Sequence, residues 1–380
     1  TSSLLNARKL FFTAAWSPAL ANIVTIGFFC LLPFTKSGDN LSIDSVQNDQ
    51  AAIWILGLGT TLGIVVMAVV QGAAVLRHGL TFTFAPQFAH PAVKKLVQLS
   101  LWTLGYVAAN QVALVVIKNL ASPGSGGVDA YSKAFVLLQL PHGLLAVSIA
   151  TTFVPDLARM FHRGDHQQFS LTMANGIRLT ALLTIPASCG LWVMSKPIIG
   201  LLFQHGNFSA AATANTARAL SGLAIGLAGF SVYLFVLRGF YARNDTRTPF
   251  FINVGENVIN IVLAIVLVDR HGVFGLGLSF SIAYLVSALV ALLILESTEV
   301  DIKLSELAFN IVRIALAAGV MTCVVWFAIR QVGSDSGVGA LSRVVTGTLI
   351  GAATYAVALS ALGEKTMRDY LSSKITKSSR

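Results

Sequence analysis

Four polar residues share one face of a long apolar segment in the second half of this chain. Asn253, Glu256, Asn257 and Asn260 follow i, i+3, i+4, i+7 spacing, so they form a stripe along one side of a helix. Such a stripe faces water, a ligand or a polar neighbour, because ionisable groups are costly in an apolar setting. Two interpretations remain open, a face lining a central cavity and hydrogen bonding between helices. Glu256 lies about two turns from one end of the segment, so snorkelling to the interface is a further option.

Other polar residues interrupt neighbouring apolar segments. Four of them are cations near segment ends, which either snorkel to the headgroups or form a cationic cavity for a phosphorylated substrate. Arg and Lys suit a pyrophosphate, and Arg adds bidentate contact. The candidate cavity residues are Asn110, Gln111, Lys118, Lys133, Gln139, Arg178, Arg218, Asn253, Glu256, Asn257 and Asn260.

The sequence contains no pattern typical of an enzyme. We find no Gly-rich phosphate loop, nucleophile elbow or zinc-ligand spacing. His162 and His166 are four residues apart, but they lie in a basic loop, and the three cysteines occupy separate apolar segments. We therefore expect no catalytic residues, no metal site and no cofactor. Without an ATP-binding motif, any transport must be driven by an ion gradient, the membrane potential or the substrate gradient.

The segments that carry these residues are long enough to cross a bilayer as helices. Of all residues 55% are hydrophobic and 11% are charged, and the mean hydropathy is +0.75. Apolar runs of about 20 residues span a hydrocarbon layer. We predict an all-α polytopic membrane protein with about ten transmembrane helices. The expected spans are 13–33, 51–76, 97–121, 129–158, 170–203, 211–240, 249–268, 272–295, 306–329 and 338–362.

The net charge of +10 indicates the orientation of the chain in the membrane rather than binding of nucleic acid. Basic residues gather in alternate connectors, such as Arg77 with Lys94 and Lys95, and Arg243 with Arg247. Connectors rich in Lys and Arg face the cytoplasm. Both ends of the chain are then cytoplasmic, which agrees with an even number of spans, since such a number leaves both ends on the same side.

Four segments resemble the MurJ/MviN lipid II flippases, in the order and spacing of that family. They read LLNARKLFFTAAWSPALANIVTIGFF, QLPHGLLAVSIATTFVPDLARMFHRGD, LLFQHGNFSAAAT and GFYARNDTRTPF. The resemblance covers essentially the whole chain and identifies the ten spans as helices five to fourteen of a fourteen-helix fold. It implies an N-terminally truncated member of the multidrug/oligosaccharidyl-lipid/polysaccharide exporter superfamily.

The resemblance also implies a division of the chain into domains. The last two helices of an N-terminal lobe would be 1–76, followed by a cytoplasmic linker at 77–96 and a six-helix C-terminal lobe at 97–296. Two terminal helices at 304–362 would form a groove for a lipid tail, and 363–380 would be a cytoplasmic tail. Residues 77–96 are either an interfacial amphipathic element or an ordinary loop.

The function implied by the resemblance is transfer of lipid II from the inner to the outer leaflet by alternating access. Lipid II is the undecaprenyl-pyrophosphate-linked peptidoglycan precursor. The expected partners are lipid II, membrane lipids, and cell-wall synthesis or regulatory proteins, and the expected location is the bacterial inner membrane. The alternatives are export of another polysaccharide-lipid or a drug, and a non-transporting scaffold for cell-wall synthesis.

Three positions depart from the family pattern. Val136 stands where the family has an arginine, and Lys133 is a candidate substitute. Gln139 replaces a glutamate, and Ile117 or Lys118 replaces an acidic residue that holds sodium in some members. Sodium coupling is therefore not expected, and the departures resemble an actinobacterial-type member.

Overall fold

The structure is a computed structural model, which describes residues 5, 11–36, 43–78, 91–122, 126–298 and 301–363. Within these residues the secondary structure is helical, and nine helices are long and apolar enough to cross a membrane, or ten if one bent pair counts as a single span. The prediction of an all-α protein with about ten spans is confirmed. Most of the linker expected at 77–96, and the tail from 364 onward, lie outside the described residues.

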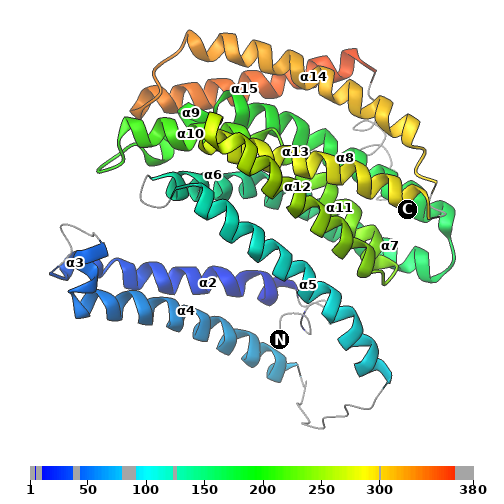
Figure 1. Cartoon of the computed structure of the whole chain (residues 1–380), viewed down its shortest axis with the longest axis horizontal. Helices are drawn as coiled ribbons and strands as arrows, with labels where there is room; N and C mark the ends of the chain where they lie inside the picture. Colours follow the sequence, from blue (N-terminus) through cyan, green and yellow to red (C-terminus); the bar gives the residue numbers. More distant parts are fainter. Residues whose placement is uncertain are drawn as a thin grey trace. The chain divides into compact units, whose positions relative to one another are not determined.

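The chain divides into two compact units, residues 1–88 and 89–380. In the first unit the two long helices α2 and α4 lie side by side (Figure 1). The Asp49 carboxylate caps the N-terminus of α4, because it accepts hydrogen bonds from the Ala51 and Ala52 amides. Its elements are α2 (Phe11–Phe29), the short η1 (Leu32–Phe34), α3 (Ile43–Gln47) and α4 (Gln50–Arg77).

The second unit is a bundle of helices packed around a continuous apolar core. The first of its helices, α5, begins at Pro91, six residues before the expected span, which suits the preference of proline for the first helical turn. The elements are α5 (Pro91–Leu120), α6 (Gly127–Pro141), η2 (His142–Val147), α7 (Ser148–His162), α8 (His166–Val193), α9 (Ser195–Phe203), α10 (Ala210–Ala224), α11 (Leu227–Ala242), α12 (Arg247–His271), α13 (Val273–Glu296), α14 (Leu304–Arg330) and α15 (Gly337–Ala361).

Helix α13 is the centre of this bundle, and it packs against α10, α11 and α12. Its approach to α10 is so close that a Cβ atom on Gly277 would lie 2.7 Å from the Leu223 amide nitrogen and 2.8 Å from the Ala219 carbonyl oxygen. Small residues allow such backbone contact between membrane helices, where dispersion forces replace the hydrophobic effect as the source of association.

Two expected spans are divided. The segment predicted at 170–203 is two helices that part at Met194, and the segment predicted at 211–240 is α10 and α11, bent by 46°. At the second break the Ser281 hydroxyl, from α13, donates to the Gly222 and Leu223 carbonyls at 2.6 and 3.2 Å. Ser281 thereby satisfies backbone groups near the bend, and because the composition is apolar on both sides of it, hydropathy does not reveal the break.

The span at 127–162 contains a π-helical turn, η2, directly after Pro141. Proline has no amide hydrogen and crowds the preceding turn, so the α-helical ladder is interrupted here. Single π-helical turns of this kind often occur at functional sites. The turn starts with His142, whose Nδ1 lies 3.0 Å from the Ser231 hydroxyl on α11.

Candidate functional site

The polar stripe of α12 is buried inside the second unit. Asn253 and Glu256 are 0% and 1% exposed. Asn110, on α5, donates from Nδ2 to the Asn253 Oδ1 at 3.2 Å, so the two asparagines join α5 to α12. The Asn253 Nδ2 lies 3.5 Å from Glu256 Oε2 and donates to it. Asn253 therefore lies between an amide on one helix and a carboxyl on its own.

The remaining two residues of the stripe are buried as well. Asn257 donates from Nδ2 to the Asn253 carbonyl at 2.9 Å, within α12. The Asn260 Oδ1 accepts from the Ser279 hydroxyl of α13 at 3.0 Å. In this structure the stripe thus takes part in hydrogen bonds between helices, and Glu256 does not snorkel to an interface. A cavity-lining role of the stripe stays a prediction.

A group of tyrosines surrounds the Glu256 carboxyl, and the periodicity of the sequence did not identify them. Tyr106 on α5, Tyr131 on α6, Tyr233 on α11 and Tyr284 on α13 all lie within electrostatic range of this carboxyl. The Tyr233 and Tyr284 rings meet edge to face, with centroids 5.4 Å apart. The only signal in the sequence was the presence of a hydroxyl-bearing aromatic residue in each of four apolar segments.

The candidate cations occupy separate environments. Lys133, on α6, pairs with Asp129 one turn earlier, and its ammonium lies 5.4 Å from the Phe208 ring centroid. Arg218, on α10, is exposed and donates to the His271 carbonyl at 3.2 Å.

The other candidate cavity residues outside the stripe are exposed or half-buried. Arg178 is half-buried on α8, and Asn110 is half-buried on α5. Lys118, Gln111 and Gln139 are exposed on their helices. Their role in substrate binding stays a prediction.

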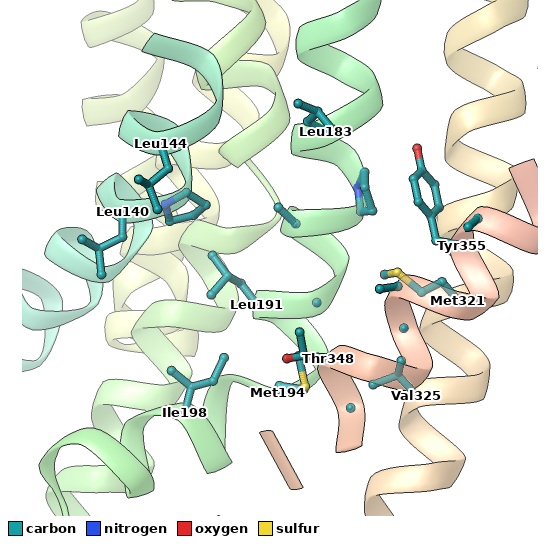
Figure 2. A pocket seen from close by; sticks show the side chains of 18 of the residues that line it. Leu140, Leu144, Leu183, Leu191, Met194, Ile198, Met321, Val325, Thr348 and Tyr355 are labelled. Carbon is teal, nitrogen blue, oxygen red and sulfur yellow. The ribbon is translucent and has the colours of Figure 1, made fainter. Parts of the chain in front are cut away.

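An apolar groove of about 650 Å³ lies between the terminal helices α14 and α15 and the rest of the second unit (Figure 2). Leu140 and Leu144 line one wall of the groove. Leu191 lies on α8 and Met194 directly after it, and Met321 belongs to α14. Ligand pockets commonly have volumes of about 300–1,000 Å³. The groove is therefore large enough for a substantial stretch of hydrocarbon.

Polar groups are nearly absent from the lining of this groove. Among its described lining residues only Thr348 and Tyr355 carry a hydroxyl, and the Tyr355 hydroxyl donates to the Leu182 carbonyl at 2.7 Å. The tyrosine thus meets its hydrogen-bonding need within the protein. A lining of this kind accepts an apolar chain and offers little to a polar headgroup.

One end of the groove is tied by an ionic cluster around Asp335, in the turn between α14 and α15. Its Oδ2 lies 2.8 Å from the Lys196 ammonium on α9, and its Oδ1 pairs with Arg343 on α15. Burial alone would raise the pKa of Asp335, but the hydrogen bonds and charges of Lys196 and Arg343 outweigh it and hold the pKa below its usual value. The cluster fastens the α14–α15 pair to α9.

Comparison with known proteins gives a consistent result. The family model described as "Lipid II flippase MurJ" matches residues 1–375. A probable lipid II flippase MurJ of Rhizobium meliloti is 28% identical over 86% of this chain and 59% of its own. The protein of the same name from Vibrio cholerae is 26% identical, over 96% of this chain and 67% of its own. A lipid II flippase MurJ from Burkholderia cenocepacia is 27% identical, over 77% and 55%.

A solved structure supports the fold. The structure described as "Lipid II flippase MurJ, inward closed conformation" matches with a TM-score of 0.70 and 24% identity, and covers 97% of this chain and 70% of its own. The chain spans 59%, 55% and 52% of three of the curated relatives that it matches.

Proposed function

Because this chain belongs to the lipid II flippase MurJ family across residues 1–375, we propose that the protein moves lipid II from the inner to the outer leaflet of the bacterial inner membrane. The observation that carries this proposal beyond the family is the apolar groove beside α14 and α15. Lipid II combines a polyprenyl tail with a charged pyrophosphate-sugar headgroup, so a transporter must treat these two parts differently. A site with so few polar groups suits the tail alone.

The groove supports the part of the proposal that concerns the tail. Its lining comes from several helical elements of one unit, α6 with η2, α8, α9, α14 and α15. Transfer of an apolar tail from water into an apolar site is favourable by about 0.8 kcal/mol of free energy per CH₂, but transfer from lipid into such a site changes the free energy little. The groove would therefore act by shape, holding the tail beside the transporter while the headgroup crosses.

The headgroup would be drawn by the cations of the second unit. Lys118 and Arg218 are exposed, and each has hydrogen-bond donors available for phosphate oxygens. Lys133 is already paired with Asp129, so a substrate phosphate would have to compete with that carboxylate. We propose that these three residues attract the pyrophosphate, with Lys118 and Arg218 contributing more than Lys133.

Alternating access and the orientation of the chain complete the proposal. The basic connectors would face the cytoplasm, which puts the Asp335 cluster at the outer side of the membrane. Rocking of one lobe against the other would open the headgroup path to one side at a time. Nothing in this mechanism requires a catalytic residue.

The experiment that tests the proposal is rescue of cells depleted of their own lipid II flippase. The protein is expressed in these cells, its membrane content is measured, and outward-exposed lipid II is assayed directly. Restored growth with restored exposure supports the proposal. Good membrane expression without exposed lipid II contradicts it, and favours another polysaccharide-lipid substrate or a scaffold role.

A further inference from the structure

Glu256 is the one carboxyl of the described bundle that combines nearly complete burial with an unpaired oxygen. The side chain is 1% exposed, and Oε1 has no hydrogen-bond partner among the described residues. The other oxygen, Oε2, has a single donor, the Asn253 amide, at 3.5 Å. At that distance the hydrogen bond is long and weak.

Among the described residues, no cation interacts with this carboxyl to compensate its charge. The titratable groups of the described structure in electrostatic range of Glu256 are all tyrosines, and they come from every element packed around it. These residues are Tyr106 on α5, Tyr131 on α6, Tyr233 on α11 and Tyr284 on α13. Arg238, also on α11, interacts electrostatically with Tyr241 and His142, and Tyr241 in turn with Tyr106 and Tyr233.

A carboxylate in this position would be expensive to keep ionised. Removing a lone charge from water without a partner costs several kcal/mol or more, and a protein avoids this cost by neutralising the group. A proton on Oε1 removes the charge, so the buried side chain no longer carries an uncompensated ion. The hydroxyl of Tyr233 interacts with the side chain of Asn253, the residue whose amide contacts Glu256.

The donor set favours a proton over a metal ion. A metal ion needs several oxygen ligands that converge on one point. In the buried stripe Glu256 is a single carboxyl, its nearest polar neighbour presents an amide donor, and no group of three His, Cys, Asp or Glu side chains in the described part of the chain could hold a metal. A proton needs only the one free oxygen.

We propose that Glu256 is a proton-binding site. The proton is bound when α5 packs against α12 as it does in this structure, which we call the closed packing. The proton comes from water and binds Oε1, and it returns to water when the contact between α5 and α12 opens and the carboxyl becomes hydrated. Asn110 and Asn253 form the polar part of that contact, since their amides bridge the two helices at 3.2 Å. The affinity of the site for a proton therefore differs between closed and open packing, which is the condition for a proton to bias the equilibrium.

A role of this proton in transport rests on the proposed function. In that case the proton would be the second ligand of the transport cycle, binding in one conformation and leaving in the other. The site itself does not depend on the identity of the transported lipid, so it is tested by a measurement that needs no transport.

The test is infrared difference spectroscopy of the purified protein in lipid, with pH steps from acid to alkaline. A protonated carboxyl has a carbonyl band distinct from that of a carboxylate. We expect a band that persists at neutral pH, where exposed carboxyls are ionised, and that is lost in Glu256→Gln. Glu306→Gln is the matched control, because the Glu306 side chain on α14 is 69% exposed, and it should leave the band unchanged.

Three results would overturn the proposal: no persistent band, a band unaffected by Glu256→Gln, or a band that sodium abolishes at constant pH, which would indicate a metal-ion site. Folding of the Gln variant is checked by its thermal unfolding. If rescue of flippase-depleted cells fails while the Glu256 band is present, the proposed substrate is wrong and the proton site stands. If rescue succeeds and the Glu256 band is missing, the proton site is wrong and the proposed substrate stands.

Discussion

Asn110 on α5 donates a hydrogen bond of 3.2 Å to Asn253 on α12, across 143 residues of sequence. The same asparagine of α12 contacts the buried carboxyl of Glu256, so one side chain links a helix contact to a titratable group. Interhelical hydrogen bonds in membranes contribute about 0.6 kcal/mol to stability on average, and at most about 1.7 kcal/mol. The pair is thus a modest source of stability, placed at a position where its breakage would change the environment of Glu256.

A double-mutant cycle measures this link. We expect Asn110→Leu and Asn253→Leu each to lower the free energy of unfolding, and the double variant to lose less than the sum, with a coupling of about 0.5–1.7 kcal/mol. The measurement is unfolding of the purified protein in mixed detergent micelles. Additive losses would mean that the two amides do not interact.

The close contact between α10 and α13 predicts that even a small side chain added at Gly277 lowers the stability of the protein. A side chain on Gly277 would press against the α10 backbone, so Gly277→Val should lower stability by about 1–3 kcal/mol, as overpacking does elsewhere. Gly255→Ala is the control, since an added Cβ at Gly255 meets nothing within 4 Å. Thermal unfolding in detergent compares the two variants, and equal stability of both would refute the close approach.

The Asp335 cluster predicts a dependence of stability on pH. Because the folded-state pKa of Asp335 is lowered by Lys196 and Arg343, its stabilising effect is present above the unfolded-state pKa of about 3.9 and is lost as the pH falls through the lowered folded-state value. Asp335→Asn should lower the midpoint of thermal unfolding at pH 7, by the equivalent of about 1 kcal/mol, and the difference from the unmodified protein should shrink in acid.

The control for this cluster is the exposed pair of Lys303 and Glu306, which are 3.5 Å apart. Glu306→Gln should change the unfolding midpoint little at any pH, because both members of the pair are well hydrated. A constant difference between Asp335→Asn and the unmodified protein from pH 7 to strong acid would mean that the ion pairs are not the source of the effect.

The proposed headgroup cations predict a loss of transport without a loss of protein. The variant that combines Lys118→Glu, Lys133→Glu and Arg218→Glu should reach the membrane normally but expose little lipid II in depleted cells. A charge-assisted hydrogen bond contributes about 1.5–3 kcal/mol, so each lost contact lowers affinity about tenfold or more. Lys303→Glu is the control for a reversed charge elsewhere, and full lipid II exposure by the triple variant would remove these cations from the mechanism.

The spans and the polar stripe could be predicted from the sequence, because the spans depend on local composition and the stripe of α12 depends on helical periodicity. The partners of the stripe could not, because Asn110 and Ser279 belong to other helices and their contacts arise only from tertiary packing. The bend between α10 and α11 has the same cause, since Ser281, far along the chain, satisfies carbonyls beside it.

The groove shows a further limit of the sequence. A resemblance implied that the terminal helices form a groove, but hydropathy assigns the same character to groove-facing and lipid-facing residues. Ala352 lines the groove, whereas Leu349, one turn earlier on α15, does not line it and is 67% exposed. Only the packing of α15 against α8 and α14 distinguishes the two positions.

Substitutions at Ala352 and Leu349 test directly whether the groove receives the lipid tail. Ala352→Trp puts an indole into the groove, and Leu349→Trp puts the same ring at an exposed position of α15 that does not line the groove. Both variants are expressed in flippase-depleted cells, and outward-exposed lipid II is measured at matched membrane levels. We predict that Ala352→Trp abolishes outward exposure of lipid II, while Leu349→Trp retains it. Equal amounts of exposed lipid II from both variants would contradict a tail-binding role of the groove.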